Sequence, residues 1–424
     1  MCVAVFCFGW LMPALGQVIS HTRPQQKSAK TAPPVVAAYV LGGALLQYSM
    51  MPSGSLQPLR QPKTPLMGPD LYKMAFGLQS RTAYGLDIGT RRIFQFHITE
   101  DGWLMPLSIP AVKTEAGLLD IVLTPDNRFL YVSNFDKGTL SQYRVQPNGV
   151  LTLLSPETLK VGASPRELFI HPTGRFLYTA NQNDHSISAF RITNTGQLVS
   201  LGPPVPSSGK PNILTFAPDG RAAYLCNWSP GSVSQYRIQD DGRLVPLAPP
   251  LMLDGGYTSV GLVISADRHA AYVSNSGGKL YQYHINADDS LSPLSPAFLP
   301  TGSSEKLVIT PSGKYVYTSN NGNGTISQFG VNSDGTMMAL SPPDVEVGQN
   351  PNPLAMDPTG RFLYTVTGGQ DTDAQITQFG IGADGRLSPL TPPTAALNSG
   401  ASLFAFVTLP PAHVAPPKHT PKHK

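Results

Sequence analysis

Short segments in which apolar and aromatic residues alternate with polar ones recur along the whole chain. The runs at residues 140–145 (LSQYRV) and 187–192 (ISAFRI) are typical, and no run has the period of a helix. Alternation of this kind indicates β-strands, because successive side chains of a strand point to opposite faces. Pro followed by Asp or Thr and then by Gly or Asn separates many of the runs, as tight turns require. The pattern predicts an all-β protein.

A tyrosine that opens a four-residue segment ending in Asn recurs at a nearly constant interval. Strong copies begin at Tyr131, Tyr178, Tyr224, Tyr272 and Tyr317, and weaker copies begin at Tyr39, Tyr84 and Tyr364. The intervals between successive copies are 45 to 48 residues. A period of this length is the signature of a repeat architecture. We expect the recurrent Asn to bond the backbone of its own loop, as Asn does in many turns.

Each repeat contains four strand-like segments. The last one carries Pro, as in Leu244–Leu247 (LVPL), which marks it as an edge strand because Pro cannot donate to a ladder. The apolar run before the Pro-x-Gly turn, such as residues 213–216, is then the inner strand. Four short strands per repeat predict one β-propeller over residues 35–410 with eight four-stranded blades. Seven blades, with the degenerate first copy packed outside the ring, remain the alternative.

The two ends of the repeat array complement each other. The first repeat has no inner strand before its second strand at residues 35–40, and the chain ends on an inner strand at residues 401–408. We therefore expect the C-terminal strand to complete the first blade, which would leave no free edge at the ring closure.

Composition and the chain ends narrow the class further. With 40 Gly and 42 Pro and only 13% charged residues, the composition is that of a chain rich in turns. The net charge is only +4, and the sequence contains no run of basic residues interleaved with aromatic ones. Nucleic acid is therefore not an expected partner. The apolar residues 1–16 end in small residues and resemble a signal peptide, although no Lys or Arg precedes Arg23. Residues 17–34 are expected to be a Pro/Lys-rich linker, and residues 411–424 a disordered basic tail.

These features favour a monomeric protein of the periplasm or the exterior, with the cytoplasm as the alternative. The apolar leader is too short to span a bilayer, so we expect no transmembrane segment. No His, Cys or Asp cluster has the spacing of metal ligands, so neither a metal nor a cofactor is expected.

The repeat phrases resemble a known family. Tyr-Val-Ser-Asn at 131–134, Pro-Asp-Gly-Arg at 218–221 and Ser-Gln-Tyr-Arg-Ile at 234–238 are similar to the Tyr-Val-Thr-Asn propeller repeats and to the lactonase-type, 6-phosphogluconolactonase-like propellers. The resemblance covers roughly residues 35–410. It implies a propeller, usually of seven blades, and hydrolysis of a lactone.

The catalytic phrases of that family are only partly present. Lactonase-type members carry Pro-Arg-His or Pro-His on an inner strand and Asn-Glu in the next loop. Here the matching phrases are Ser164-Pro-Arg-Glu167 and Asn181-Gln182. Arg166 matches the family, Glu167 stands in place of His, and Gln182 stands in place of Glu. The departure leaves open whether the family's activity is retained.

The repeat phase predicts one set of polar residues at the mouth of the central channel. These are Asp120, Arg166, Glu167, Lys210, Asn212, Glu305, Lys306 and Asn352. For catalysis, the candidates are Arg166 to bind an acidic group and Glu167 or Glu305 as general base. Asp120, Lys210, Asn212, Lys306 and Asn352 are candidates for ligand binding. Alternatively, the whole set is a solvated rim of ion pairs.

Three functions follow from these residues. The first is an exported module that binds a small polar or anionic ligand, or a protein or glycan partner, at the channel mouth. The second is a lactone hydrolase of the 6-phosphogluconolactonase-like type. The third is a structural role in envelope assembly. Partial loss of the catalytic phrases favours the first, and the family resemblance favours the second.

Overall fold

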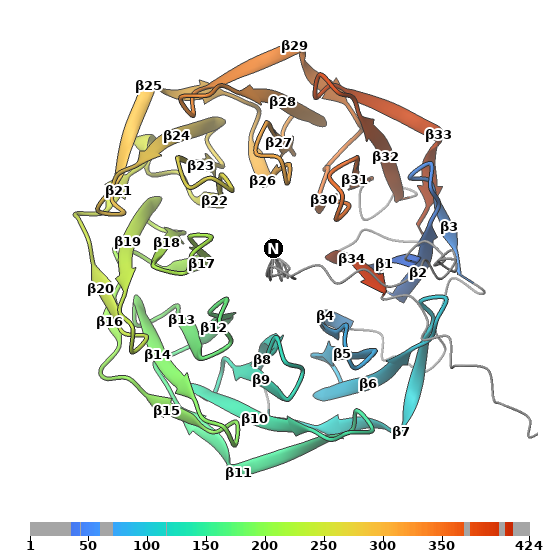
Figure 1. The fold of residues 1–424 in the computed structure, drawn as a ribbon, viewed down its shortest axis with the longest axis vertical. Helices are drawn as coiled ribbons and strands as arrows, with labels where there is room; N and C mark the ends of the chain where they lie inside the picture. Colours follow the sequence, from blue (N-terminus) through green and yellow to red (C-terminus); the bar gives the residue numbers. More distant parts are fainter. Residues whose placement is uncertain are drawn as a thin grey trace, which may run out of the picture.

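The computed structural model describes residues 35–42, 44–59, 71–115, 117–368, 374–397 and 403–409. The segments expected to be a signal peptide, a linker and a basic tail lie outside these residues. Within them the chain forms eight antiparallel sheets, which we call blades 1 to 8. The sheets stand around a common centre as a closed ring (Figure 1). The prediction of eight blades is confirmed.

The blades contain the following strands. Blade 1 has β34 (Leu403–Leu409), β1 (Val35–Gly42), β2 (Ala44–Met50) and β3 (Leu56–Pro58). Blade 2 has β4 (Leu71–Gly77), β5 (Thr82–Asp87), β6 (Arg92–Ile98) and β7 (Leu104–Lys113). Blade 3 has β8 (Leu118–Leu123), β9 (Phe129–Asn134), β10 (Thr139–Val145) and β11 (Leu151–Lys160). Blade 4 has β12 (Pro165–Ile170), β13 (Phe176–Asn181), β14 (Ser186–Ile192), β15 (Leu198–Ser200) and β16 (Val205–Pro206).

The second half of the ring repeats this order. Blade 5 has β17 (Pro211–Phe216), β18 (Ala222–Asn227), β19 (Ser232–Ile238), β20 (Leu244–Pro246) and β21 (Leu251–Met252), and a short 3-10 turn, η1 (Asp254–Gly256), follows it. Blade 6 has β22 (Ser259–Ile264), β23 (Ala270–Asn275), β24 (Lys279–Ile285) and β25 (Leu291–Pro300). Blade 7 has β26 (Ser304–Ile309), β27 (Tyr315–Asn320), β28 (Thr325–Val331) and β29 (Met337–Glu346). Blade 8 has β30 (Leu354–Met356), β31 (Phe362–Thr367), β32 (Gln375–Ile381) and β33 (Leu387–Ala396).

The ring closes within blade 1. β34 is antiparallel to β1, with Val35 opposite Leu409 and Leu41 opposite Leu403. The last strand of the chain is thus the inner strand of the first blade, as predicted. The same pairing puts both ends of the propeller on one face, which we call the lower face. The upper face carries the starts of the inner strands and the turns after the second strands.

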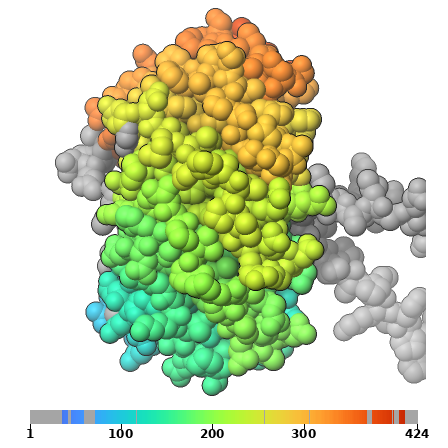
Figure 2. Space-filling model, turned by 90° about the vertical axis from the view of Figure 1, so that its left-hand side faces the viewer, coloured from blue at the N-terminus to red at the C-terminus, as the bar shows by residue number. Residues whose placement is uncertain are grey.

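The core lies between the blades. The described apolar residues form eight clusters, and each cluster joins two neighbouring blades, including blade 8 with blade 1. Every residue of strands such as β9, β13 and β18 is buried. Both faces of these strands are covered, because each sheet lies between two neighbouring blades. Viewed from the side, successive blades form a continuous wall (Figure 2).

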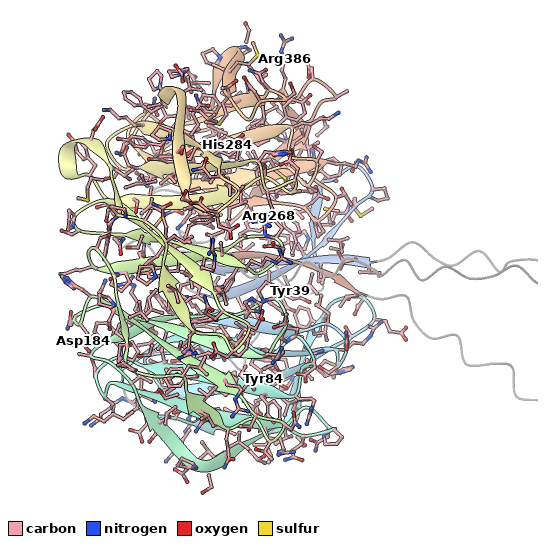
Figure 3. All side chains as sticks on the ribbon, turned by 60° about the vertical axis from the view of Figure 1, so that its left-hand side comes forward. Tyr39, Tyr84, Asp184, Arg268, His284 and Arg386 are labelled. Atoms are coloured by element: carbon pink, nitrogen blue, oxygen red, sulfur yellow. The ribbon has the colours of Figure 1, made fainter. Side chains whose placement is uncertain are left out.

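The recurrent tyrosine links each blade to the one after it. In all eight blades its hydroxyl donates a hydrogen bond of 2.6 to 2.8 Å to a backbone carbonyl in the turn between the third and fourth strands of the following blade. We call this contact the tyrosine bridge. The acceptor residues all have positive φ, between 68° and 90°, and seven of them are Gly. Gly adopts this conformation without a steric penalty, which explains why Gly recurs in this turn. Tyr39 and Tyr84, labelled in Figure 3, form two of the bridges.

The recurrent asparagine acts mainly within its own hairpin. Asn134 Nδ2 donates to the hydroxyls of Thr139 and Ser141 at 3.0 Å, and Asn181, Asn227 and Asn320 make the same pair of contacts. The expected bond to the loop backbone is therefore largely replaced by bonds to side-chain hydroxyls of the next strand.

A glutamine in the third strand makes a second link between blades. The Gln side-chain oxygen accepts a hydrogen bond from the backbone N–H at the start of the next blade's outer strand, as Gln142 does from Leu198 at 2.8 Å. Seven blades make this contact, which we call the glutamine bridge. In blade 4 the position is Ala189, so Leu244 N–H has no amide opposite it.

The variant Ala189→Gln should therefore supply the missing bridge between blades 4 and 5. A net gain of about 1 kcal/mol is usual for one internal hydrogen bond, so we expect a higher midpoint of thermal unfolding. The matched variant Gln142→Ala leaves a buried N–H unpaired and should cost ~1–3 kcal/mol. Calorimetry or circular dichroism measures both. A lower midpoint for Ala189→Gln would show that this junction has no space for the amide.

Candidate functional site

The upper face brings two sets of loops together, as the repeat phase predicted. In blades 3 to 8 the turn after the second strand is bonded to the loop before the inner strand: Gln182 N–H donates to Ser164 O at 3.0 Å, and Trp228 N–H donates to Lys210 O at 2.7 Å. Asp184, at the left of Figure 3, belongs to one of these turns. These backbone hydrogen bonds fix where the inner strand begins relative to the end of the second strand.

A β-bulge recurs at the start of the inner strands. In β4, β8, β12, β17, β22 and β26 the register shifts after the first residue, so the bulge inserts an extra residue. The described bulge residues are half-buried, and they are Tyr72, Leu119, Arg166, Asn212 and Val260. The residue after each bulge is buried, and these are Lys73, Asp120, Glu167, Ile213, Gly261 and Lys306. In these strands the bulge residue is therefore more open to solvent than the residue that follows it.

Three of the buried positions form one charged cluster across three blades. Lys73 Nζ lies 2.8 Å from Asp120 Oδ1 and 2.6 Å from Glu167 Oε2. The side chains of Lys73, Asp120 and Glu167 are only 3%, 7% and 8% exposed. Charges removed from water to this degree are costly unless they pair and accept further hydrogen bonds.

Asp120 has those further bonds. Its Oδ2 accepts a hydrogen bond of 2.7 Å from Leu168 N–H, and its Oδ1 accepts one of 2.9 Å from Ile121 N–H. Ser133 of β9 links β8 to β12, since its Oγ accepts a hydrogen bond from Asp120 N–H and donates one to Arg166 O. Asp120 therefore joins blade 3 to blade 4 and supports the bulge that carries Arg166.

The electrostatics of the cluster distinguish its members. Burial alone lowers the pKa of Lys73, but Asp120 and Glu167 raise it by more, so the amine stays protonated. Burial raises the pKa of Glu167 to about 7, opposed by Lys73 and aided by the negative charge of Asp120. One ammonium thus pairs with two buried carboxylates, and Glu167 changes its protonation near neutral pH.

Arg166 lies beside this cluster and is more open. Its Nε is 3.7 Å from Glu167 Oε1, and its guanidinium lies 5.3 Å from the ring centre of Trp228, a cation–π contact. Among the described residues no side chain or carbonyl makes a hydrogen bond with the guanidinium, and the buried Nε has the ion-pair contact with Glu167 but no hydrogen-bond partner. Arg166 is therefore held in place by stacking while its donors remain available.

The remaining predicted site residues do not all join this group. Asn212 occupies the same bulge position in blade 5 as Arg166 does in blade 4, and Lys210 is exposed in the loop before it. Lys306 and Asn352 belong to blades 7 and 8, which lie on the opposite side of the ring from β8 and β12 (Figure 1). The backbone of Glu305 lies in β26, but its side chain is outside the described part of the structure. Of the predicted residues, Asp120, Arg166 and Glu167 thus lie together in blades 3 and 4, and Asn212 holds the matching position in blade 5.

Sequence reasoning missed Lys73, Tyr72 and Trp228. A signal for the first two was present: Lys73 precedes Tyr84 by eleven residues, as Asp120 precedes Tyr131 and Glu167 precedes Tyr178. Aligning the weak second repeat on its tyrosine would have placed Lys73 beside the two carboxylates. Trp228 gave no such signal, because its ring reaches Arg166 from a loop of the next blade.

The described residues provide neither a cluster of metal ligands nor a helix that could span a membrane. They contain no group of three or more His, Cys, Asp or Glu side chains arranged to hold a metal ion. Their single helical turn is far too short to cross a membrane.

Known structures share this fold. A candidate 6-phosphogluconolactonase of Bacteroides uniformis superposes with a TM-score of 0.58 at 17% identity, covering 88% of this chain and 99% of that one. A periplasmic gluconolactonase of Pseudomonas aeruginosa gives 0.55 at 19% identity, covering 89% and 100%. A dihydro-heme d1 dehydrogenase gives 0.62 at 13% identity, covering 90% and 77%. Identities this low establish the fold alone.

Sequence comparison is more specific. No curated protein matches the chain significantly. The family profile described as lactonase, 7-bladed beta-propeller, matches residues 94–209 and 299–391. The first stretch contains Asp120, Arg166 and Glu167. The resemblance expected from the repeats is confirmed: the chain matches the lactonase β-propeller family, with eight blades where the family description names seven.

Proposed function

We propose that the protein hydrolyses a sugar lactone at the upper mouth of its channel. The observation that carries this proposal is Glu167, a buried carboxylate whose pKa is raised to about 7 beside an Arg with free donors. Perturbed carboxylates of this kind are characteristic of catalytic sites. The match to the lactonase family favours ester hydrolysis over other acid–base reactions.

The reaction needs one base and one anion-binding group. Glu167 Oε2 is bonded to Lys73, which leaves Oε1, on the side of Arg166, to accept a proton from water. The water oxygen then bonds to the lactone carbonyl carbon. When the ring C–O bond breaks, the proton on Glu167 passes to the departing ring oxygen, and the product is a hydroxy acid. Arg166 holds an acidic group of the substrate by charge-assisted hydrogen bonds.

Glu167→Gln should lower kcat by about 100- to 10,000-fold, because it removes the general base without changing the side-chain shape. In the wild-type protein kcat/KM should rise as the pH increases through about 7, since only the ionised carboxylate accepts a proton. A pH-stat with a panel of aldonolactones measures both. Glu157→Gln, on the exposed outer strand β11, is the matched control.

Arg166→Ala in the same assay should raise KM for acidic lactones and leave neutral ones nearly unaffected. If no lactone is turned over above background, or if Glu167→Gln retains full activity, the proposed reaction is wrong.

Lys73→Met should have two effects. It leaves two buried carboxylates without their cation, which should cost about 3–5 kcal/mol of stability. It also removes the charge that lowers the pKa of Glu167, so the rise of kcat/KM should move to higher pH in the folded variant. Chemical denaturation and the pH profile measure the two effects separately. Lys314→Met, an exposed lysine of the lower face, should change neither. An unshifted profile in a folded Lys73→Met protein would contradict the role given to Lys73.

Binding without turnover is the second candidate. The observation that favours it is the low exposure of Glu167, which limits access of water, beside the unpaired donors of Arg166. In that case calorimetry with sugar acids should show binding that Arg166→Ala abolishes and Glu167→Gln leaves intact, with no lactone consumed.

We also propose that the protein is exported to the periplasm or beyond. The apolar residues 1–16 with small residues at their end support this. Expression of the full chain with its own leader should give a mature protein that begins near Gln17, as read by intact mass. Protein that keeps Met1 and remains in the cytoplasm would contradict export.

A further inference from the structure

Tyr72 occupies in blade 2 the bulge position that Arg166 occupies in blade 4. The register of β4 shifts between Leu71 and Lys73, so Tyr72 is the bulge residue and is half-buried at the start of the inner strand. Its neighbour Lys73 extends from the same bulge to Asp120 and Glu167. Bulges recur beside active sites because they redirect a side chain. Tyr72 and Arg166 thus hold the same position at the starts of their inner strands, in the two blades on either side of blade 3.

The charged cluster acts on the Tyr72 phenol. Burial raises the pKa of Tyr72, Lys73 and Arg166 oppose the rise, and Glu167 and Asp120 add to it. All four charged residues of the site therefore lie within electrostatic reach of this one side chain. The upward shift keeps the phenol protonated at neutral pH, where it is a hydrogen-bond donor.

Tyr72 differs from the tyrosines that hold the ring together. The eight recurrent tyrosines are fully buried, and each donates its hydroxyl to a carbonyl of the following blade. Tyr72 lies outside that repeat phase, twelve residues before Tyr84. Its hydroxyl makes no hydrogen bond with any described residue and is not among the buried unpaired atoms. The donor is therefore free to meet a ligand.

We propose that Tyr72 is a further catalytic residue, which donates a hydrogen bond to the carbonyl oxygen of the lactone. This role rests on the proposed hydrolysis. As water adds to the carbonyl carbon, the C=O electron pair moves to the oxygen, and Tyr72 O–H stabilises that negative charge without giving up its proton. Glu167 carries the proton that moves, and Arg166 holds the acidic group. The three residues then have separate tasks.

The test compares wild type, Tyr72→Phe and Tyr257→Phe, the last an exposed tyrosine beside blade 6. Removing one donor to a developing oxyanion typically lowers kcat by about 100- to 1,000-fold, so we expect that loss for Tyr72→Phe with KM changed little. Its pH profile should keep the rise near 7 that belongs to Glu167. Tyr257→Phe should retain wild-type kcat. Equal thermal midpoints would show that Tyr72→Phe is folded.

The outcomes separate the two proposals. If wild type is active and Glu167→Gln is not, but Tyr72→Phe keeps wild-type kcat, the role of Tyr72 is wrong and hydrolysis stands. If Tyr72→Phe raises KM and leaves kcat unchanged, Tyr72 binds the substrate equally in the ground and transition states and is not an oxyanion donor. A wild-type protein without turnover overturns both proposals.

Discussion

The ring depends on the hydrogen bond from a buried tyrosine of one blade to a turn of the next. A phenol hydroxyl without water must find an acceptor, and the tyrosine bridge supplies one in every blade. The acceptor turn needs positive φ, which links the position of Gly in one blade to the position of Tyr in its predecessor. Tyr364 of blade 8 donates to Gly54 of blade 1, so the same contact that spaces the blades also closes the ring.

The candidate site occupies positions at which the side chain is not fixed by the packing between blades. Because the tyrosine bridges end in turns of the lower face and the apolar clusters lie between the blades, the bulge positions at the starts of the inner strands can vary without loss of the core. Blades 5 and 6 place Ile213 and Gly261 at the position after the bulge, whereas the adjacent blades 2, 3 and 4 all place a charged residue there: Lys73, Asp120 and Glu167. Their mutual pairing is what makes three buried charges tolerable in adjacent blades. The same arrangement shifts the pKa of Glu167 and leaves the guanidinium of Arg166 with hydrogen-bond donors that no described residue uses.

The tyrosine bridge and the glutamine bridge differ in how many of the junctions between blades contain them. The tyrosine bridge is present at all eight junctions, but the glutamine bridge is absent where Ala189 faces blade 5. The outer strands of blades 4 and 5 are also each split into two short pieces, β15 with β16 and β20 with β21. Blade 4, which supplies Arg166 and Glu167, thus lacks one of the two hydrogen-bonded links to the following blade. The apolar cluster at that junction, around Tyr178 and Tyr236, holds it together.

The sequence by itself determined the repeat, the order of strands in a blade and the closure by β34, because these follow from local signals: the spacing of tyrosines, Pro in outer strands and a missing inner strand at Val35. Phase also placed Asp120, Arg166 and Glu167 correctly on the upper face. Only the tertiary structure decided which of the polar residues meet. Lys73 reaches across blade 3 to Glu167, Trp228 stacks on Arg166 from the neighbouring blade, and Lys306 lies on the opposite side of the ring. Such contacts depend on how the blades are arranged around the ring, and the spacing of residues along the sequence does not contain that information.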